Sequence, residues 1–370
     1  MHALTNTKIY TGQAVLVNHS VLIDAGMIKA ILPDSQLPAD IQRTDLKGND
    51  LVPGFIDFQV YGGSTGFFVK DLSLDSLQNI VETHRQDGTT NLVPTLYSTT
   101  FDRIIKAIDV TRNWIESGRG GVLGLHIEGP FLNSEKRGAH NIDIVRVPTR
   151  YELEAIVERS AGLPTVMTIA PEVWPDDLLE LALGSHLILS IGHTNATYAQ
   201  ATNYFKKGIG LATHFYNAMR PLEGREPGVV GAILDSSDVC ASIIVDGFHC
   251  DYAAVRIAKK VMGDRLFLIS DATFAHFKGH RFEFDGFSAN YINRQFVNDE
   301  GKLAGSAITL LEAVQNCVNH VGITKAEAFR MVSLYPAKQL GLENKLGQIA
   351  TGYKADLVVL DKDLEVVGVY

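Results

Sequence analysis

Hydrophobic and polar residues follow two rhythms along the chain. Between residues 52 and 270, continuous runs of Val, Ile and Leu alternate with segments whose apolar residues recur at helical spacing. Continuous apolar runs are typical of strands that are buried on both faces, as in a parallel sheet. Eight such runs predict strands, at residues 51–60, 89–96, 122–130, 165–172, 187–194, 210–215, 241–249 and 266–272.

Helical patterns separate most of these runs. The clearest helical patterns cover residues 75–87, 101–117, 150–161 and 196–207. Thr149 with Glu152, and Thr324 with Glu327, have the spacing of an N-terminal capping box. Eight strand–helix units match the size of a (β/α)8 barrel, whereas doubly wound sheets usually have fewer strands. The predicted fold class is therefore α/β, with a (β/α)8 TIM-like barrel.

The two ends of the chain have a different texture. The first fifty residues contain short alternating segments with turn residues between them, which predicts a small antiparallel β unit. Residues 354–370 return to the same pattern, and neither end alone has enough strands for a stable sheet. We expect residues 1–51 plus 343–370 to form a small β-sandwich domain, attached to a barrel of residues 52–342.

Composition and charge exclude several classes of function. The net charge of −9 and the pI near 5.7 do not suit a nucleic-acid surface, which needs a basic face. No run approaches the roughly 20 apolar residues that span a bilayer, and the N-terminus lacks a secretion signal. Cys240, Cys250 and Cys317 form no CxxC pair, which suits a reducing compartment. We expect a cytoplasmic protein that binds neither nucleic acid nor membrane.

Ionisable side chains gather where the predicted strands end. Barrel enzymes carry their chemistry at the C-terminal ends of the strands. The polar residues at these positions are Asp57, Gln59, His126, Glu128, His193, His214, Asp246, His249 and Asp271. A single buried histidine is usually a satisfied core residue. Core packing does not explain so many ionisable strand ends, because each buried charge needs a partner. A shared metal ion would supply that partner.

Two imidazoles and one carboxylate, with an open position for water, form a common catalytic zinc site. Glu128, His193 and His214 fit this set. His126 shares a strand face with Glu128 and is interpreted as a hydrogen-bonding neighbour of the site rather than a ligand. Asp271 is predicted to lie beside the metal-bound water as a general acid/base. A helix N-cap and a fourth metal ligand are the alternative interpretations of Asp271.

The same residues lie in motifs that resemble a known family. The matching stretches are PGFIDFQ (53–59), GLHIEGPFLN (124–133), KRGAHN (136–141), IGHTNAT (191–197), THFYNAM (213–219), GREPGVVGAILD (224–235), DGFHCDYA (246–253), SDAT (270–273) and LAGSAIT (303–309). PGFID alone is general among amidohydrolases, whereas HIEGPF, GAHN, THFYNAM and GREPG are specific to sugar-phosphate deacetylases. Over almost its whole length, the chain resembles the N-acetylglucosamine-6-phosphate deacetylases of the amidohydrolase superfamily.

The resemblance implies a reaction and a set of site residues. A metal-activated water would hydrolyse the acetamido group of N-acetyl-D-glucosamine 6-phosphate to D-glucosamine 6-phosphate and acetate, in amino-sugar catabolism. Glu128, His193 and His214 would again be the ligands and Asp271 the acid/base, while His140 would polarise the acetyl carbonyl. The implied substrate contacts are Ala139, His140, Asn217, Ala218, Arg225, Asp246, Gly247, Phe248, His249, Leu303, Ala304 and Gly305. Relatives of this kind are usually homodimers.

Arg225 and His249 have a chemistry that suits the phosphate of such a substrate. A guanidinium offers a forked pair of donors to a phosphate, and His249 could add a further donor. Backbone N–H groups near Asn217 and Ala218 could complete the anion site. A local pocket of this kind would allow a protein with a net charge of −9 to bind an anion.

Two stretches depart from the family pattern. Many amidohydrolases carry His-x-His at the end of the first strand for a second metal, whereas this chain has Gln59-Val60-Tyr61. We therefore predict one divalent metal ion, Zn(II) by preference, with Fe(II) or Co(II) as alternatives. Residues 272–290 match the family poorly. His276 and His280 in that segment are interpreted as exposed loop histidines without a role, although the segment could shape sugar specificity.

Two other functions stay open on the sequence. The first is the same chemistry on N-acetylgalactosamine 6-phosphate, which differs at one sugar hydroxyl. The second is a catalytically inactive barrel retained as a binding protein. That second possibility predicts losses among the ligands or the acid/base, but Glu128, His193, His214 and Asp271 are all present.

Overall fold

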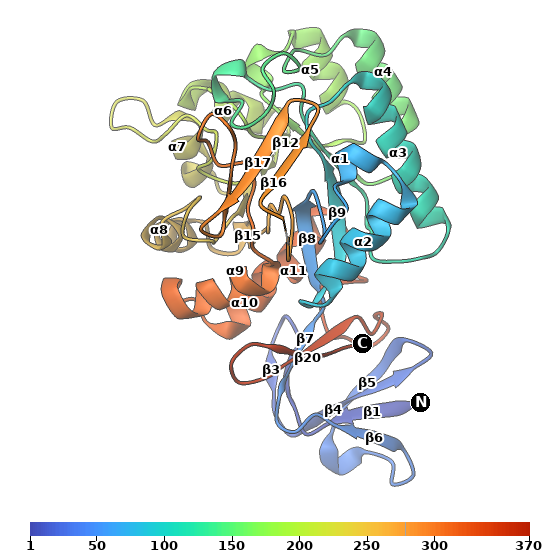
Figure 1. Cartoon of the computed structure of the whole chain (residues 1–370). Coiled ribbons are helices and arrows are strands. Elements are labelled where there is room, and N and C mark those ends of the chain that lie inside the picture. The colour runs from blue at the N-terminus through green and yellow to red at the C-terminus, as the bar shows by residue number, and fades with distance from the viewer. Residues whose placement is uncertain (278) are drawn as a thin grey trace.

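Eight parallel strands form the centre of the protein, for which the computed structural model describes residues 1–277 and 279–370. They pair in one sheet in chain order, from β8 round to β15. The strands are β8 (Phe55–Val60), β9 (Thr89–Leu96), β10 (Leu125–Glu128), β11 (Thr165–Ile169), β12 (Ile188–Ile191), β13 (Leu211–Ala212), β14 (Cys240–Ile243) and β15 (Leu266–Leu268). Helices surround this sheet (Figure 1). The predicted α/β barrel is confirmed.

The barrel closes just beyond the ends of its first and last strands. Val60 and Ala272 form a parallel bridge there. The Asp271 N–H donates to the Gln59 carbonyl at 3.0 Å, and the Tyr61 N–H donates to the Ala272 carbonyl at 3.0 Å. This closure lies at the C-terminal ends of the strands, so it fixes Asp271 beside the end of β8.

The predicted helices are present with small changes at their ends. The helices are α1 (Phe68–Asp71), α2 (Leu74–Arg85), α3 (Phe101–Glu116), α4 (Arg150–Arg159), α5 (Asp176–Leu183), α6 (Tyr198–Lys206), α7 (Gly228–Asp235), α8 (Tyr252–Met262), α9 (Leu310–Asn316), α10 (Lys325–Met331) and α11 (Leu334–Gln339). Short turns of 3-10 helix lie at Asp34–Gln36, Ser134–Lys136, Pro171–Val173 and Gly263–Arg265, with a π-helix at Cys317–Val321.

Of the two predicted capping boxes, one is complete. Thr149 and Glu152 exchange both hydrogen bonds at the start of α4. Thr324 accepts from the Glu327 N–H at the start of α10. The Glu327 carboxylate instead pairs with Lys259. A charge-assisted ion pair is stronger than a hydrogen bond to a neutral N–H, so it takes the carboxylate away from the cap.

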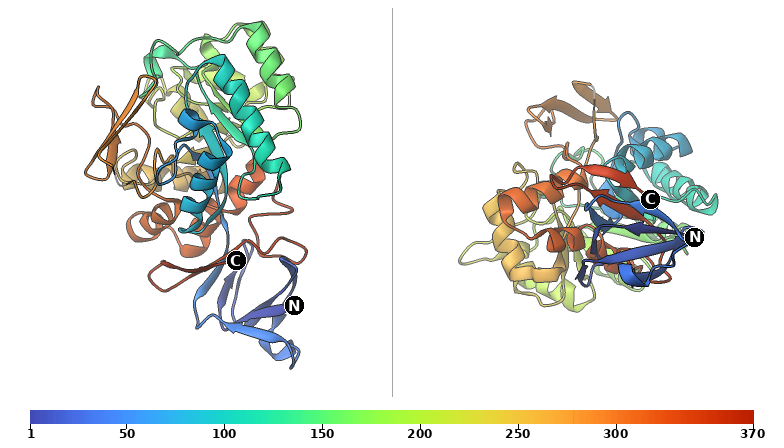
Figure 2. Two further views of the ribbon diagram at one scale, coloured as in Figure 1. Left: turned by 45° about the vertical axis from the view of Figure 1, so that its right-hand side comes forward. Right: turned by 90° about the horizontal axis from the view of Figure 1, so that it is seen from below.

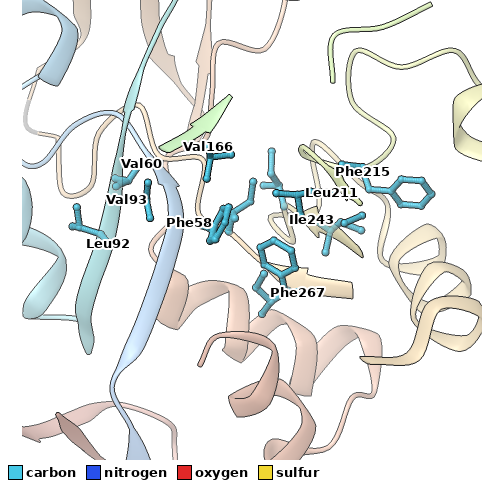
Figure 3. Close-up of a cluster of buried hydrophobic side chains, with 14 of the residues drawn as sticks. Phe58, Val60, Leu92, Val93, Val166, Leu211, Phe215, Ile243 and Phe267 are labelled. Carbon is cyan, nitrogen blue, oxygen red and sulfur yellow. The ribbon is translucent and has the colours of Figure 1, made fainter. Parts of the chain in front are cut away.

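The interior of the barrel explains the continuous apolar runs. All eight residues of β9 are buried, because the interior covers one face of the strand and the helices cover the other. Figure 3 shows Phe58, Val166, Ile243 and Phe267 from four different strands converging in this core. The rings of Phe58 and Phe267 meet edge to face, with centroids 5.4 Å apart.

Both ends of the chain contribute to two further sheets below the barrel (Figures 1 and 2). The first has the order β5 (Met27–Pro33), β4 (His19–Asp24), β1 (His2–Thr5) and β6 (Gln42–Asp45). The second has the order β20 (Val366–Val369), β19 (Leu357–Leu360), β7 (Asp50–Pro53), β2 (Lys8–Tyr10) and β3 (Val15–Leu16). Leu4, Ile23 and Leu51 share a buried core with Leu357 and Val359.

The expectation of purely antiparallel pairing at the N-terminus was wrong. β1 pairs with β6 in parallel, and β2 pairs with β7 in parallel. Both parallel pairs join strands that are distant in the chain, with whole hairpins between them, so short-range turn signals could not reveal them. The division of the chain into residues 1–51 plus 343–370 and residues 52–342 stays a prediction.

The divergent segment 272–290 contributes to a small sheet that the sequence did not predict. β16 (Arg281–Phe284), β17 (Phe287–Ile292) and β18 (Gln295–Val297) form a small antiparallel sheet. In Figure 1 this sheet lies in front of the barrel strands, and the turned view of Figure 2 places it to one side of them. Within the described part of the chain, no helix is both long and apolar enough to cross a membrane.

Candidate active site

Four of the predicted site residues lie at the C-terminal ends of the barrel strands. Glu128 is the last residue of β10, while His193, His214 and Asp271 follow β12, β13 and β15 within three residues. These last three have φ angles of 48°, 36° and 54°, in the left-handed region that non-glycine residues seldom adopt. Each such conformation costs about 1 to 3 kcal/mol and persists where the surrounding structure enforces it, often at functional sites.

Glu128, His193 and His214 bring three ligand atoms into a tight triangle. Glu128 Oε1 lies 3.0 Å from His214 Nε2 and 3.4 Å from His193 Nε2, and the two Nε2 atoms lie 3.0 Å apart. Tetrahedral ligands at about 2.0–2.1 Å from a zinc ion are about 3.3 Å from one another. The spacing of these atoms therefore fits one small divalent metal ion.

The hydrogen bonds of His193 present the correct nitrogen to this triangle. His193 Nδ1 lies 2.9 Å from the Lys136 carbonyl. A carbonyl only accepts, so Nδ1 carries the proton and the Nε2 lone pair points toward Glu128 and His214. Burial, opposed by the hydrogen bond to Glu128, lowers the pKa of His214, which keeps that imidazole neutral as a ligand must be.

Gln59 and Tyr61 donate to the carboxylate of Glu128. Gln59 Nε2 donates to Glu128 Oε1 at 3.0 Å, and the Tyr61 hydroxyl donates to Oε2. Burial and the charges of Glu128 and Asp271 raise the pKa of Tyr61, so its hydroxyl stays a donor. The departure from His-x-His therefore has a structural role: these two side chains orient Glu128. The sequence showed them only as missing ligands.

Glu128 itself is ionised. Burial alone would raise the pKa of Glu128, but its contacts with His193 and His214 outweigh burial and hold that pKa well below the ordinary value. A buried carboxylate that has two imidazole rings on one side and the uncharged donors of Gln59 and Tyr61 on the other provides a strong attraction for a cation.

His140 lies at the edge of the triangle. Its Nε2 is 3.8 Å from Glu128 Oε2, and Glu128, His140 and His193 can also place ligand atoms within 4.8 Å of one another. The set with His214 is tighter and matches tetrahedral spacing, so it is a better candidate for a metal centre than the set with His140. His140 Nδ1 lies 2.6 Å from the Ser98 hydroxyl. Burial lowers the pKa of His140 well below its ordinary value, so its ring is neutral.

Asp271 is a buried carboxyl beside the triangle. Its Oδ1 has no hydrogen-bond partner among the described residues. Burial and the charge of Glu128 raise the pKa of Asp271 well above its ordinary value. This shift of the pKa favours the protonated form, which a general acid requires. No helix begins directly at Asp271, so the N-cap interpretation is wrong.

A cavity of about 450 Å³ opens over these residues. The predicted site residues that line it are Glu128, Ala139, His140, His193, His214, Asn217, Ala218, His249, Asp271, Leu303, Ala304 and Gly305. Asp246, Gly247 and Phe248 lie outside the lining, and Phe248 is 46% exposed. Arg225 also lies outside it, in the exposed loop between β13 and α7.

Asp246 holds both the ring and the backbone of His249 in place by hydrogen bonds. His249 Nδ1 lies 2.6 Å from Asp246 Oδ2, and Asp246 Oδ1 accepts from the Phe248 and His249 N–H groups at 2.8 Å each. Burial opposes ionisation of Asp246, but its hydrogen bond with His249 is among the contacts that lower the pKa overall. The carboxylate therefore holds the His249 ring, which leaves Nε2 available to the cavity.

Three basic residues at the cavity had no predicted role. Lys136, Arg137 and Lys302 line it. Arg137 Nη2 donates to both carboxylate oxygens of Glu300, at 2.8 and 2.7 Å, and Nη1 donates to the His140 carbonyl at 2.7 Å. The pair joins the loop that carries His140 to the loop after β18. Lys136 and Arg137 lie in the KRGAHN motif, and that signal could have nominated them.

The other polar residues of the strand ends face different partners. His126 Nε2 lies 2.7 Å from Thr168 Oγ1, so its hydrogen bond goes to the barrel interior rather than to the three ligand candidates. Asp57 Oδ1 accepts from the N–H groups of Gln59 and Ser270 at 3.2 Å each. His276 and His280 are exposed, as expected, and His276 pairs with Asp87 at 2.6 Å.

Known proteins share both the sequence and the fold. The profile of the Amidohydrolase family matches residues 51–370, and that of the NagA composite domain matches residues 1–51. An N-acetylglucosamine-6-phosphate deacetylase of Haemophilus influenzae is 38% identical, over 99% of this chain and 97% of that protein. An N-acetylgalactosamine-6-phosphate deacetylase of a Shewanella species is 32% identical, over 90% and 84%.

A solved structure agrees with these relatives. The crystal structure of N-acetylglucosamine-6-phosphate deacetylase from Pasteurella multocida superposes with a TM-score of 0.95 at 38% identity. The match covers 100% of this chain and 97% of that one. Fold and site together define the class, an α/β-barrel hydrolase with a buried cluster that could bind a metal. The chain belongs to the amidohydrolase family.

Proposed function

We propose that this protein hydrolyses the acetamido group of N-acetyl-D-glucosamine 6-phosphate to D-glucosamine 6-phosphate and acetate, in amino-sugar catabolism. The triangle of Glu128, His193 and His214, facing the buried carboxyl of Asp271, is the observation that carries the proposal. The likeness to relatives that bear the name of this activity, at 38% identity, supports the substrate.

Glu128, His193 and His214 would hold one divalent metal ion. One carboxylate and two imidazoles suit Zn(II), and Fe(II) or Co(II) would also accept these ligands. When bound, such an ion lowers the pKa of a coordinated water and polarises a carbonyl oxygen. Tyr61 donates to Oε2 of Glu128 and Gln59 donates to Oε1, so the place of a second pair of histidine ligands is taken by hydrogen-bond donors, which supports a single ion at this position.

Asp271 would move the proton. It accepts the proton of the attacking water and delivers that proton to the departing amine nitrogen. A carboxyl without another partner on Oδ1 is free for both steps. The nearby charge of a metal ion would favour the ionised form of Asp271 that begins the cycle.

His140 would stabilise the negative charge that develops on the carbonyl oxygen. Its neutral ring can carry a proton on Nε2 when the Ser98 hydroxyl donates to Nδ1. That N–H would then point toward the carboxylate side of the triangle, where Nε2 lies. Donors fixed in this way contribute strongly to the rate of acyl transfer.

The phosphate would bind on the side of β13 and β14. His249, Asn217 and Ala218 line the cavity there, and Asp246 holds the His249 ring. Lys136 adds positive charge to the lining, while Arg137 and Lys302 are both paired with Glu300. A local positive group of this kind would help a chain of net charge −9 to admit an anion. Leu303, Ala304, Gly305 and Ala139 would contact the sugar.

Arg225 is not among the described residues that line the active-site cavity, so its predicted phosphate contact needs a second copy of the chain or a different position of its loop. We propose a homodimer in which the loop of Arg225 joins the partner's site. The exposure of Arg225 and of Leu222, at 53%, leaves this loop available. Arg225→Ala should raise KM more than it lowers kcat, and light scattering should give twice the chain mass. A monomer would contradict the homodimer, and an unchanged KM would contradict the phosphate contact.

N-acetylgalactosamine 6-phosphate is the second candidate substrate. A relative of that name is 32% identical, against 38% for the relative named for the gluco sugar. Paired kinetics with the two sugars decide between them. A preference of about tenfold or more for the galacto sugar, about 1.4 kcal/mol, would contradict the first choice.

We also propose that the protein works in the cytoplasm. Cys240, Cys250 and Cys317 are free in the part of the chain that the structure describes, which suits a reducing compartment.

Acetate release from a panel of N-acetylated sugars, with and without a 6-phosphate, tests the proposed function. We expect release from N-acetylglucosamine 6-phosphate and a much lower kcat/KM for N-acetylglucosamine. Equal rates on both would contradict the role of the phosphate, and no release from any sugar would contradict the activity.

A further inference from the structure

Aromatic side chains wall one side of the cavity in a closed series of contacts. The Tyr61 hydroxyl bonds to Glu128, and the Tyr61 ring lies stacked 6.5 Å from the ring of Phe67. Phe67 in turn stacks on Phe287, with centroids 5.5 Å apart. These three rings lead from the candidate metal centre to the hairpin of β16 and β17.

The same series returns to Glu128 through two further rings. Phe287 meets the edge of Tyr97 at 4.8 Å, and Tyr97 stacks on His140 at 4.2 Å. His140 Nε2 lies 3.8 Å from Glu128 Oε2. Every member of the series lines the cavity. We call the five rings the aromatic collar: Tyr61, Phe67, Tyr97, His140 and Phe287.

The order of the strands places one ring of the collar, Tyr97 after β9, across the barrel from Asn217, which follows β13. Tyr61 and Tyr97 directly follow β8 and β9, whereas Asn217 and His249 follow β13 and β14. In a closed barrel of eight strands, β13 stands opposite β9. If the phosphate lies over β13 and the amide lies at the triangle, the acyl half points toward β9 and the ring of Tyr97.

We propose that the aromatic collar is the acyl-binding cup of this enzyme, and that Phe287 limits the acyl group to acetyl. The inference rests on the proposed function, because it assigns one half of that substrate. It adds a specificity-determining residue from the segment 272–290, which departs from the family pattern.

The collar is too firmly packed to yield to a longer chain. Phe67, Phe287 and Tyr97 are 1%, 4% and 6% exposed, so their rings have little room to turn. Each additional methylene in a pocket of fixed size changes specificity by roughly 10- to 200-fold. The methyl of an acetyl group therefore fits where a butyryl chain must displace a ring.

The hairpin turn holds Phe287 in place. Asp285 and Gly286 have φ angles of 50° and 78°, as in a two-residue turn that favours glycine, and Phe284 pairs with Phe287 across it. A Cβ on Gly286 would lie 2.4 Å from Asn141 Nδ2. The tip of the hairpin thus packs directly against the loop that carries His140.

The test compares acyl chain lengths on the full-length, zinc-loaded protein. The substrates are N-acetyl-, N-propionyl- and N-butyrylglucosamine 6-phosphate, and the readout is the released primary amine. The variants are Phe287→Ala and the more conservative Phe287→Leu, which guards against misfolding of the first. Ile292→Ala is the matched control, since Ile292 lies on the same strand and is 53% exposed.

We expect wild type to favour acetyl over butyryl by roughly tenfold or more, and Phe287→Ala to reduce that preference by about tenfold. Phe287→Leu should be intermediate, and Ile292→Ala should match wild type. Calorimetry should also show that the double variant Asp271→Asn, Phe287→Ala binds the butyryl compound more tightly than Asp271→Asn alone does.

Three results would overturn the inference. Wild type could accept butyryl as well as acetyl, or both Phe287 variants could keep the wild-type preference while they remain active on acetyl. Ile292→Ala could change the preference as much as Phe287→Ala. If wild type releases no amine from any of the substrates, the proposed function itself is contradicted. The acyl-binding cup then falls with it, because the cup depends on that function.

Discussion

Two of the three residues of the candidate metal centre are held by hydrogen bonds to neighbouring groups, whereas His214 Nδ1 has no partner among the described residues. His193 receives its orientation from the Lys136 carbonyl, and Glu128 receives its orientation from Gln59 and Tyr61. The left-handed backbone of His193, His214 and Asp271 turns their side chains at the strand ends. Such strain persists only where neighbours enforce it, so the site is built before any ligand arrives.

The proposed acid/base role of Asp271 predicts a loss of turnover without a loss of metal. Asp271→Asn keeps the size of the side chain but cannot accept a proton, and general acid–base steps are worth about 10²- to 10⁴-fold in rate. We expect kcat to fall by about that factor while the bound metal, measured by mass spectrometry, stays at the wild-type level. Loss of the metal would show that Asp271 is a ligand.

The Tyr61 hydroxyl predicts an effect on metal affinity. Tyr61→Phe removes one donor to Glu128 and keeps the ring in the collar, and losses of such supporting contacts cost about 10- to 100-fold in affinity or activity. Competition with a chelator should show weaker binding of Zn(II). Tyr198→Phe is the control, because the Tyr198 hydroxyl bonds to Asp235 on an exposed part of the surface. Equal affinities in both variants would contradict the role of Tyr61.

At the scale of elements, the start of α4 offers a direct test of local structure. Thr149 caps this helix through its side chain, whereas Thr100 at the start of α3 makes no side-chain cap. Thr149→Ala should lower the free energy of unfolding by about 1 kcal/mol, and Thr100→Ala should lower it by much less. Urea denaturation of both variants measures the difference. A larger loss at Thr100 would contradict the capping account.

The elements that the sequence predicts well are those with a strong local pattern. Apolar runs define the barrel strands, and their last residues lead directly to Glu128, His193, His214 and Asp271. Gln59 and Tyr61 were read only as absent ligands, because their donors are useful only once Glu128, which is distant in the chain, lies beside them. Parallel pairing of β1 with β6 depends on long-range contacts in the same way.

The aromatic collar and Arg225 lie beyond what sequence patterns can reveal. Phe287 comes from a segment without family motifs, and its position depends on a hairpin that folds back over the barrel mouth. Arg225 sits in a strong motif, yet a single chain leaves it exposed and away from the cavity. The motif identifies Arg225 as a candidate site residue, but it does not show whether Arg225 would contact substrate in its own chain or in a second copy.

At the scale of the whole molecule, closure of the barrel buries the carboxyl of Asp57, which makes the free energy of unfolding depend on pH. Burial raises the pKa of Asp57 to about 7 from an ordinary value of 3.8, although hydrogen bonds from Ser270 and Gln59 oppose the shift. Its folded pKa exceeds its unfolded pKa, so its contribution to stability is complete below about pH 4 and is lost as the pH rises through 7.

In the metal-free protein, Asp57 should therefore lower the free energy of unfolding by up to about 1.4 kcal/mol for each unit of pH increase between pH 4 and 7. Asp57→Asn should flatten this dependence and raise stability relative to wild type above pH 7. Asp75→Asn, at an exposed position of α2, is the control. Urea denaturation at a series of pH values measures all three proteins. A variant with the wild-type slope would contradict the burial account of Asp57.

Metal removal and return, followed by acetate release from N-acetylglucosamine 6-phosphate, is the most direct measurement of the central claim. We predict that chelation abolishes release, and that activity returns in proportion to bound Zn(II) and saturates at one ion per chain. His214→Asn should neither bind the ion nor recover, whereas His140→Asn should still bind it. Full activity in the metal-free protein, or no acetate release at one bound ion per chain, would contradict the account.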